Sequence, residues 1–414
     1  MLVLGIVLFA LGIMVSIVLH EYGHMRVAQA TGMKVRRFFV GFGPTVWSTH
    51  RGGIEYGLKA VPLGGFCDIA GMTAYDRLDP EDEPKAMWRQ AWWKRVAVLL
   101  AGPVMNIVLA ILLFYVVAVG WGLANRDVKA VPAAEVAALV GETCVPLAPG
   151  AEDKPDCGEG VGPAGAAGIR AGDRITGVDG EPVHNWSEVA PLVSGRAGQT
   201  VTVTVDRAGA PVTARVPVAA VPVPGQADRG ALGVALAEEA VPAKYRDDPD
   251  YQRIHTYDAV SAIPATFVFT GDMIRLTLEG LASFPSKIPG VVASIFGAER
   301  AEDSPVSVVG ASHIGGQAVE MGLWNVFLLF LAGLNLFLGA FNLVPLTPFD
   351  GGHIAVVFYE KVRDALRRLR GLAPGGPADY EKLAPLTMAV FVVLIGVSVI
   401  VITADFVNPI LLPG

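Results

Sequence analysis

The chain has 414 residues, of which 52% are hydrophobic and 17% are charged, and its mean hydropathy is +0.49. This composition is too apolar for an ordinary soluble protein and predicts several membrane spans with room for one soluble domain. The formal net charge of −7 is unevenly placed, and the absence of a basic block or nucleic-acid motif argues against nucleic-acid binding.

The first predicted element is a transmembrane helix within residues 1–32. Residues 2–19 contain no charged side chain and run directly into His20-Glu21-Tyr22-Gly23-His24. Because no Lys or Arg precedes the apolar run and no small-residue cleavage site follows it, we expect a retained span and not a signal peptide. Thr31-Gly32 is expected to end the helix.

His20 and His24 are four residues apart, so they share one face of this helix. Two imidazoles at this spacing can hold one Zn²⁺, and Glu21 between them can take a proton from the attacking water. Such a short pattern also occurs by chance in soluble proteins. At the end of a membrane span, however, each ionisable group costs on the order of a few kcal/mol unless it has a partner, a metal or water. The setting therefore favours a metalloprotease-like site.

Residues 33–70 change to short alternating segments broken by glycines, including Gly41-Phe42-Gly43. This pattern predicts two or three strands with tight turns. Strands beside an intramembrane site need a pairing partner or a cavity. An unpaired edge near Tyr56 to Val61, which includes Leu58, would bind an extended substrate by strand addition. A small cytoplasmic hairpin without a substrate role is the alternative.

Residues 71–95 form a charged connector, and residues 96–121 form the second predicted span. The connector ends among tryptophans that are typical anchors at a membrane surface, namely Trp88, Trp92 and Trp93. Within the span, Gly102-Pro103 allows close helix approach and Asn106 adds a polar side chain. We expect Asn106 to bond a neighbouring helix or backbone, with substrate contact as the alternative.

Residues 125–240 are rich in Ala, Gly, Pro and Val, and they are predicted to form the soluble domain. Gly172-Asp173-Arg174-Ile175 is followed by the alternating Thr200 to Val205 and by a strand-like Leu232-Gly233-Val234. The series resembles a bacterial PDZ domain, a fold that binds peptide ends by strand addition. Leu232, Gly233 and Val234 are therefore candidate peptide-binding residues.

The three cysteines fall on two sides of the predicted membrane. If the soluble domain is extracytoplasmic, Cys144 and Cys157 are close enough in sequence to close a short disulfide loop. Two free cysteines are the alternative. Cys67 would lie on the opposite side and stay reduced.

Residues 241–321 carry the weakest pattern. Residues 261–296 are moderately apolar and are interrupted by Pro264, Pro285 and Pro289. We expect amphipathic segments on the outer membrane surface, with a span through the bilayer as the alternative.

The third predicted span lies within residues 322–353 and ends in a motif that runs from Asn342 to Gly352. Two prolines, Pro345 and Pro348, break the helix just before Asp350. A catalytic zinc normally has three protein ligands and one open position, so the two histidines need a third group. Asp350 is the best-placed carboxylate, and His353 is the competing ligand.

The depth of these groups constrains the topology. His20 and Asn342 lie at similar positions in their spans, roughly 26–29 Å along the helix at 1.5 Å per residue. The two groups can therefore meet only if both helices cross the membrane in the same direction.

Residues 354–385 form a basic connector, and residues 386–408 form the fourth predicted span. Because basic residues also crowd the connector after the first span, the positive-inside rule places both connectors in the cytoplasm. The termini and the soluble domain then lie outside, with the metal site near the cytoplasmic face. The predicted fold is a polytopic α-helical membrane protein of about four transmembrane helices, with a membrane-entering β-hairpin and an inserted extracytoplasmic PDZ-like α+β domain.

Four motifs, taken together, resemble those of one family, the bacterial intramembrane site-2 proteases. They are His20-Glu21-x-x-His24, the Gly41-Phe42-Gly43 turn, Ala101-Gly102-Pro103 with Asn106, and Asn342-x-x-Pro345-x-x-Pro348-x-Asp350-Gly351. The resemblance covers nearly the whole chain and is strongest to the actinobacterial and mycobacterial branch. The family usually has Leu where this chain has Phe349, an apolar exchange.

The resemblance implies zinc-dependent hydrolysis of peptide bonds inside or at the edge of a substrate's transmembrane helix, in the cell membrane. It implies His20, His24 and Asp350 as zinc ligands, Glu21 as the group that activates water, and Asn342 as a candidate for orienting the scissile backbone or oxyanion. Family substrates include single-pass anti-sigma factors, usually trimmed first by an extracytoplasmic protease, and remnant signal peptides.

Two other classes of function remain open from the residues alone. A non-enzymatic PDZ membrane scaffold would not need Glu21. A metal transporter would need acidic or histidine residues along several spans, which this chain lacks.

Overall fold

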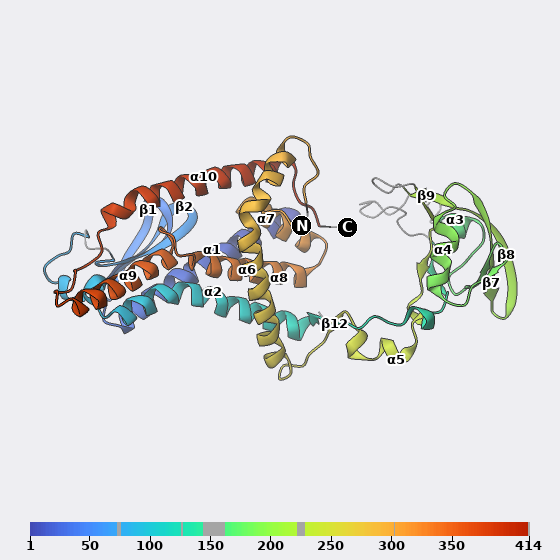
Figure 1. The fold of residues 1–414 in the computed structure, drawn as a ribbon, viewed down its shortest axis with the longest axis horizontal. Helices are drawn as coiled ribbons and strands as arrows, with labels where there is room; N and C mark the ends of the chain where they lie inside the picture. The colour runs from blue at the N-terminus through green and yellow to red at the C-terminus, as the bar shows by residue number, and fades with distance from the viewer. Residues whose placement is uncertain (73–75, 126, 144–161, 222–227, 302, 413–414) are drawn as a thin grey trace. The chain divides into compact units, whose positions relative to one another are not determined.

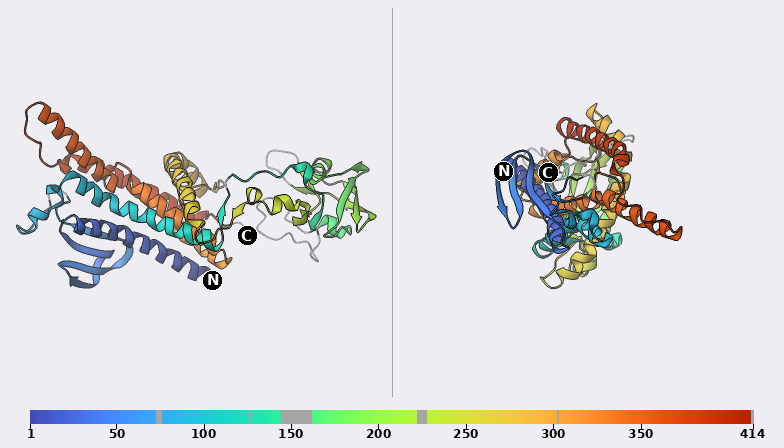
Figure 2. Two further views of the ribbon diagram at one scale, coloured as in Figure 1. Left: turned by 90° about the horizontal axis from the view of Figure 1, so that it is seen from below. Right: turned by 90° about the vertical axis from the view of Figure 1, so that its left-hand side faces the viewer.

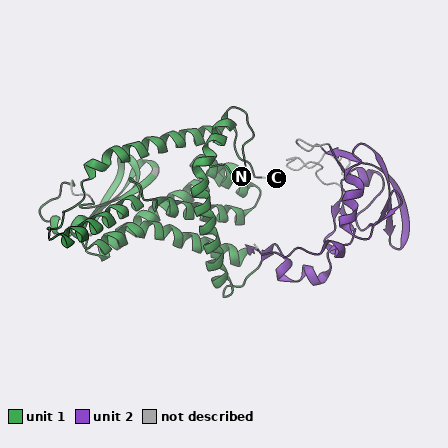
Figure 3. Cartoon of the chain, viewed as in Figure 1, with its two compact units in different colours: residues 1–121, 256–412 green, residues 122–255, 413–414 purple. Residues whose placement is uncertain are grey.

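The structure is a computed structural model that describes residues 1–72, 76–125, 127–143, 162–221, 228–301 and 303–412 (Figure 1). The chain forms two compact units. The first, the membrane unit, contains residues 1–121 and 256–412, and the second, the inserted unit, contains residues 122–255 (Figure 3). Cys144 and Cys157, for which the sequence leaves open a disulfide or two free thiols, lie outside the described residues.

Among the described residues, four helices of the membrane unit are long and apolar enough to cross a bilayer. They are α1 (Leu2–Ala30), α2 (Trp92–Gly120), α8 (Trp324–Asn342) and α10 (Ala384–Val407). The chain therefore folds as a multi-pass helical membrane protein, as its composition predicts. In α1 the polar side chains Ser16, His20 and His24 are buried while Val3, Val7 and Val15 are exposed, which is the pattern of a helix in lipid.

α7 (Val308–Glu320) packs against the N-terminal half of α1. A Cβ atom at Gly5 of α1 would lie 2.8 Å from the Cα atom of Gly316, so glycine is required for the two backbones to approach this closely. Eight of the thirteen residues of α7 are buried. The prediction that this part of residues 241–321 lies on the membrane surface is therefore wrong for α7, because glycines give the helix a flat face that fits inside the bundle.

α6 (Ala262–Ile295) is one continuous helix that crosses the other helices and contacts α2, α8 and α10 (Figure 1). Pro285 and Pro289 lie inside it, so they do not divide it into segments as expected. Each proline removes one backbone hydrogen bond. The hydroxyls of Ser283 and Ser286 bond to preceding carbonyls in the same turns.

β1 (Val35–Arg51) and β2 (Ile54–Ile69) form an antiparallel pair with several register shifts, and they lie alongside α1 (Figure 2). Phe38 pairs with both Cys67 and Tyr56, and Tyr56 pairs with both Phe38 and Thr49. The backbone of Tyr56 thus has a neighbour on each side. The expectation of a free edge near Tyr56 to Val61 is wrong at Tyr56 and Leu58, because the long hairpin folds back on itself.

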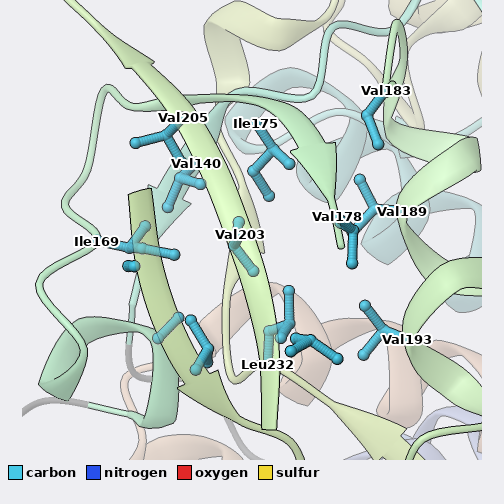
Figure 4. Packing of buried hydrophobic residues seen from close by; sticks show 14 of the residues in the cluster. Val140, Ile169, Ile175, Val178, Val183, Val189, Val193, Val203, Val205 and Leu232 are labelled. Atoms are coloured by element: carbon cyan, nitrogen blue, oxygen red, sulfur yellow. The ribbon is translucent and has the colours of Figure 1, made fainter. Parts of the chain in front are cut away.

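The inserted unit is built on a four-stranded antiparallel sheet in the order β6-β5-β7-β8. The strands are β5 (Arg174–Val178), β6 (Glu181–Pro182), β7 (Thr200–Arg207) and β8 (Ala210–Pro217). Val201, Val203 and Val205 alternate with threonines and are buried, as the sequence pattern predicts (Figure 4). The short helices α3 (Pro163–Ala166) and α4 (Val189–Ser194) add Ala164, Val189 and Val193 to this apolar core.

Three short strand pairs complete the inserted unit. They are β3 (Leu123–Ala124) with β12 (Ile254–His255), β4 (Val140–Glu142) with β11 (Ala235–Leu236), and β9 (Ala219–Val221) with β10 (Arg229–Ala231). A one-turn helix, α5 (Ala243–Arg246), lies between β11 and β12. The β3–β12 pair joins the two ends of the unit, where the chain enters and leaves the membrane unit.

Asp173, a buried carboxylate just before β5, forms an ion pair with the partly exposed Arg207 of β7. Asp173 accepts hydrogen bonds from Nε and Nη2 of Arg207 and from the Arg170 amide, and the Arg207 contact in particular holds its pKa below the usual value. Because the carboxylate is favoured in the folded state, its stabilisation is complete above the unfolded pKa of about 3.9 and is lost as pH falls through the lower folded value.

We expect Arg207→Leu to lower the unfolding free energy of the fragment 122–255 at neutral pH, because the Asp173 carboxylate loses its strongest donor. The difference from wild type should shrink below about pH 4. Thermal unfolding followed by circular dichroism measures both effects, with Arg215→Leu on β8 as the exposed control. Equal loss at all pH values would contradict the assignment.

Candidate metal centre

Three side chains from distant parts of the chain meet near the C-terminal end of α1. His20 Nε2 lies 3.1 Å from His24 Nε2, and Asp350 Oδ2 lies 3.3 Å and 3.4 Å from these two nitrogens. Their side chains are only 10%, 9% and 13% exposed. Two imidazole nitrogens and a carboxylate oxygen that converge in a buried site are a donor set that suits a catalytic zinc.

The space in front of the two histidines is kept open by Gly102 of α2. A Cβ atom at this position would collide with His24 Nε2 and would lie 2.6 Å from His20 Nε2. Gly23, between the histidines, lets α1 approach α2, since a Cβ atom there would lie 2.5 Å from the Ala101 carbonyl oxygen. The residues present therefore fit a metal ion held by both Nε2 atoms. The sequence predicted Gly102 as a helix-packing residue, and its place against the ligands appears only in the structure.

The orientation of His24 is fixed from α2. Its Nδ1 donates a hydrogen bond to the Val98 carbonyl oxygen at 2.7 Å, which leaves Nε2 unprotonated for a metal. His20 Nδ1 is buried and has no hydrogen-bond partner among the described residues. A backbone partner of this kind cannot be predicted from the sequence, because any residue at position 98 has the same carbonyl group.

Glu21 lies next to β2. The backbone amide of Cys67 donates to Glu21 Oε2 at 2.9 Å, and a Cβ atom at Gly65 would lie 3.6 Å from Glu21 Cγ. The second half of β2 therefore positions this carboxylate while leaving Oε1 available. The thiol of Cys67 takes no part in this contact.

Asp350 is the first residue of α9 (Asp350–Leu369), and its position depends on the two glycines that follow it. Cβ atoms at Gly351 and Gly352 would collide with the backbone of Leu343 and Leu346. The segment after α8 can therefore fold back over the first turn of α9, which directs Asp350 toward α1.

Three other polar residues that the sequence singles out, His353, Asn342 and Asn106, are not among the residues of this cluster. His353 Nδ1 is 3.2 Å from the Tyr380 hydroxyl, so the competing ligand is directed elsewhere. Asn342 Nδ2 donates to the Leu338 carbonyl oxygen of its own helix. Asn106 is 1% exposed, and its Oδ1 has no partner in the described part of the chain, so the expected bond from that oxygen to a neighbouring helix is absent there.

The predicted substrate-binding residues fall in both units. Gly41 and Gly43 have positive φ angles in β1, while Phe42 and Leu58 are about half exposed. Leu232-Gly233-Val234 connects β10 and β11 and is not a strand, because Gly233 has a φ of +72° that interrupts the extended backbone. Leu232 is buried, and its carbonyl accepts a bond from the Ala164 amide.

Comparison with known proteins gives concordant matches over nearly the whole chain. The model of Peptidase family M50 matches residues 8–373. The chain is 48% identical to the zinc metalloprotease Rip1 of Mycolicibacterium smegmatis over 412 residues, which cover 98% of both proteins. It is 46% identical to Rip1 of Mycobacterium tuberculosis over 420 residues, or 99% of both, and 32% identical to a putative zinc metalloprotease of Mesorhizobium japonicum over 85% of this chain and 86% of that protein.

The position of Gly102 leads to a prediction about metal binding. Gly102→Ala should weaken zinc binding by about tenfold or more, the scale of a lost supporting contact at a metal site, because the added methyl group occupies the space in front of both Nε2 atoms. Chelator competition on purified protein measures this. Gly120→Ala in the same helix is the matched control, since a Cβ atom there meets nothing within 4 Å. Unchanged zinc affinity in Gly102→Ala would refute the role.

Proposed function

This chain belongs to peptidase family M50 and is a zinc-dependent metalloendopeptidase of the site-2 type, and we propose that it cuts single-pass membrane proteins within or beside their transmembrane helices. Membership of the family decides against a non-enzymatic scaffold and against a metal transporter. The observation that carries the proposal is the meeting of His20, His24 and Asp350 beside Glu21, at the end of an apolar helix.

Zinc is the cofactor, and we assign His20 Nε2, His24 Nε2 and Asp350 Oδ2 as its ligands. When bound, zinc acts as a Lewis acid that polarises a carbonyl group and makes water a nucleophile at neutral pH. The chain itself supplies the proton transfer. Glu21 accepts a proton from the attacking water at Oε1 and later donates it to the leaving amine nitrogen. The Cys67 amide holds Oε2 and so keeps the carboxylate in place during both transfers.

Asn342 is the candidate for orienting the scissile backbone or stabilising the oxyanion. Its amide nitrogen now bonds to Leu338, so this role requires the side chain to turn toward the substrate. A neutral amide suits the task because it donates a hydrogen bond without adding a charge at membrane depth.

A helical substrate must unwind before its carbonyl groups are accessible to a protease. We propose that the unwound segment lies along the β1–β2 hairpin, where residues 65–67 adjoin Glu21. Gly41, Phe42 and Gly43 would shape the path at the turn. Because the backbone of Tyr56 is already paired on both sides, Tyr56 and Leu58 would contribute through their side chains.

For the cellular setting, we propose the cytoplasmic membrane, with the zinc ligands near the cytoplasmic face and the inserted unit outside. Substrates would be anti-sigma factors or signal-peptide remnants, first trimmed by an extracytoplasmic protease. The inserted unit, in the role of a PDZ-like domain with Leu232, Gly233 and Val234 at its peptide site, would hold back substrates with bulky ectodomains. It contains none of the proposed ligands.

The ligand assignment makes a first prediction of function. Glu21→Gln should retain one zinc per chain and lose cleavage by several orders of magnitude, since proton transfer is lost while the ligands stay. Asp350→Ala should lose zinc. Metal analysis and cleavage of a model transmembrane peptide measure these outcomes, with His353→Ala as the neighbouring control that keeps zinc. If Asp350→Ala retained zinc and His353→Ala lost it, the third zinc ligand would be His353 and not Asp350.

The proposed role of the inserted unit, which is to hold back substrates with bulky ectodomains, can be tested by deletion. Replacing residues 160–236 by a flexible linker should leave hydrolysis of a short transmembrane peptide within about twofold and should permit cutting of an untrimmed substrate. Rates on both substrates, normalised to bound zinc, test this. Loss of peptide hydrolysis in a zinc-bound deletion variant would show that the unit is a required docking site instead.

A further inference from the structure

We propose that the C-terminal half of α9 together with its C-cap residue Arg370, residues 358–370, is a binding site for anionic lipid headgroups at the membrane surface on the side of the zinc ligands. The inference does not depend on which substrate the enzyme cuts. It rests on an uncovered apolar face, its basic flanks, and the contacts that fix the rotation of the helix.

The apolar face of this segment is exposed along its whole length. The exposed fractions are 46% for Phe358, 59% for Val362, 52% for Leu366 and 85% for Leu369. On a helix with 3.6 residues per turn these positions form one stripe. Tyr359 adjoins the stripe and is 59% exposed. A stripe of this length requires a cover in the functional protein, because contiguous exposed apolar surface is costly in water.

Basic side chains border the stripe on both sides. At 100° per residue, Lys361 and Arg368 fall on one border, and Arg363 and Arg370 fall on the other. Asp364 offsets one of them, because its Oδ1 lies 3.0 Å from Arg363 Nη2. Glu360 is buried against Arg95, so Lys361, Arg368 and Arg370 keep the borders basic. An apolar face between basic borders is the pattern of a helix that lies in the headgroup region of an anionic bilayer.

The opposite face of α9 is held against the protein. Glu360 Oε2 accepts a hydrogen bond from Arg95 Nη1 of α2 at 2.5 Å, and both side chains are buried. Glu360 Oε1 accepts a second bond from the Ala378 amide at 2.7 Å. Because this paired carboxylate is costly to release, the helix cannot rotate its apolar stripe inward.

Tryptophans at the start of α2 place the segment at the level of the membrane surface. The ring centroids of Trp92 and Phe358 are 5.9 Å apart, and Lys361 Nζ lies 5.4 Å from the ring centroid of Trp92. Trp93 beside it is 54% exposed. Indole rings favour the interface between hydrocarbon and water. The charge of the borders and this position together favour a lipid surface over a second protein as the cover.

Lipid binding at this segment would affect the position of Asp350, one of the proposed zinc ligands. Asp350 and the lipid-binding segment belong to the same continuous helix, so a shift of the segment moves the ligand. Anionic lipid is therefore expected to stabilise the arrangement in which Asp350 meets His20 and His24.

The test uses the full-length protein in nanodiscs of phosphatidylcholine, alone or mixed with phosphatidylglycerol. An environment-sensitive fluorophore is attached to the Leu366→Cys variant, in a background with the native cysteines replaced by alanine. We expect a blue shift of its emission, and quenching by lipids spin-labelled near the headgroup, as phosphatidylglycerol increases. The zinc-normalised cleavage rate should rise over the same range.

Charge reversal separates this binding from general membrane contact. The double variant Arg368→Glu/Arg370→Glu should require at least about fivefold more phosphatidylglycerol for the half-maximal blue shift. The reason is that each basic residue near an anionic surface strengthens membrane binding by about fivefold. Its zinc content should match that of wild type, which shows that the fold is intact. Lys85→Glu/Lys382→Glu is the matched control, because both lysines are exposed and lie outside α9.

Two results would overturn the proposal. One is emission that does not respond to phosphatidylglycerol in the wild-type background. The other is efficient cross-linking of the Leu366→Cys variant between two chains in liposomes, which would show that a second copy covers the stripe.

Discussion

Ionisable side chains at membrane depth need partners, and the arrangement of the membrane unit follows from this requirement. His20, His24 and Asp350 bring three such groups together where none would be stable alone in hydrocarbon. Their meeting requires α1, α2 and α9 to converge closely. Gly23 on α1 and Gly102 on α2 let these two helices approach, and Gly351-Gly352 makes the approach possible where α9 begins. The chemistry of the site is therefore inseparable from the packing of small residues around it.

The cost of charge at membrane depth also explains why the proposed catalytic carboxylate, Glu21, is held by a backbone group. A Cys67 amide bonds Glu21, and a Val98 carbonyl orients His24. Backbone groups add no charge at membrane depth, and they are rigid where strands or helices fix them. The hairpin thus serves two purposes, since its second half both aligns Glu21 and adjoins the place where an unwound substrate would lie.

Much of the fold followed from the sequence because long apolar runs and metal-ligand spacing are strong local signals. The four spans, the paired histidines and the alternating strand at Thr200 to Val205 were predictable in this way. Contacts between distant segments were not. The inward position of α7, the pairing of Tyr56 on both sides and the left-handed Gly233 depend on what each segment meets in the folded chain. The proposed role of Gly102 is of the same kind, since a glycine in an apolar helix looks the same whether it faces lipid or a ligand.

The separation of the ligands along the chain has a consequence for biosynthesis. More than three hundred residues lie between His24 and Asp350, including the whole inserted unit. A ribosome-bound chain that has already placed α1 in the membrane has Glu21 and two histidines but lacks the carboxylate that completes the donor set. The chain therefore acquires its hydrolytic capacity late in synthesis, after the inserted unit has been made. With the proposed ligand set, an unfinished chain would therefore not yet cleave the membrane proteins around it.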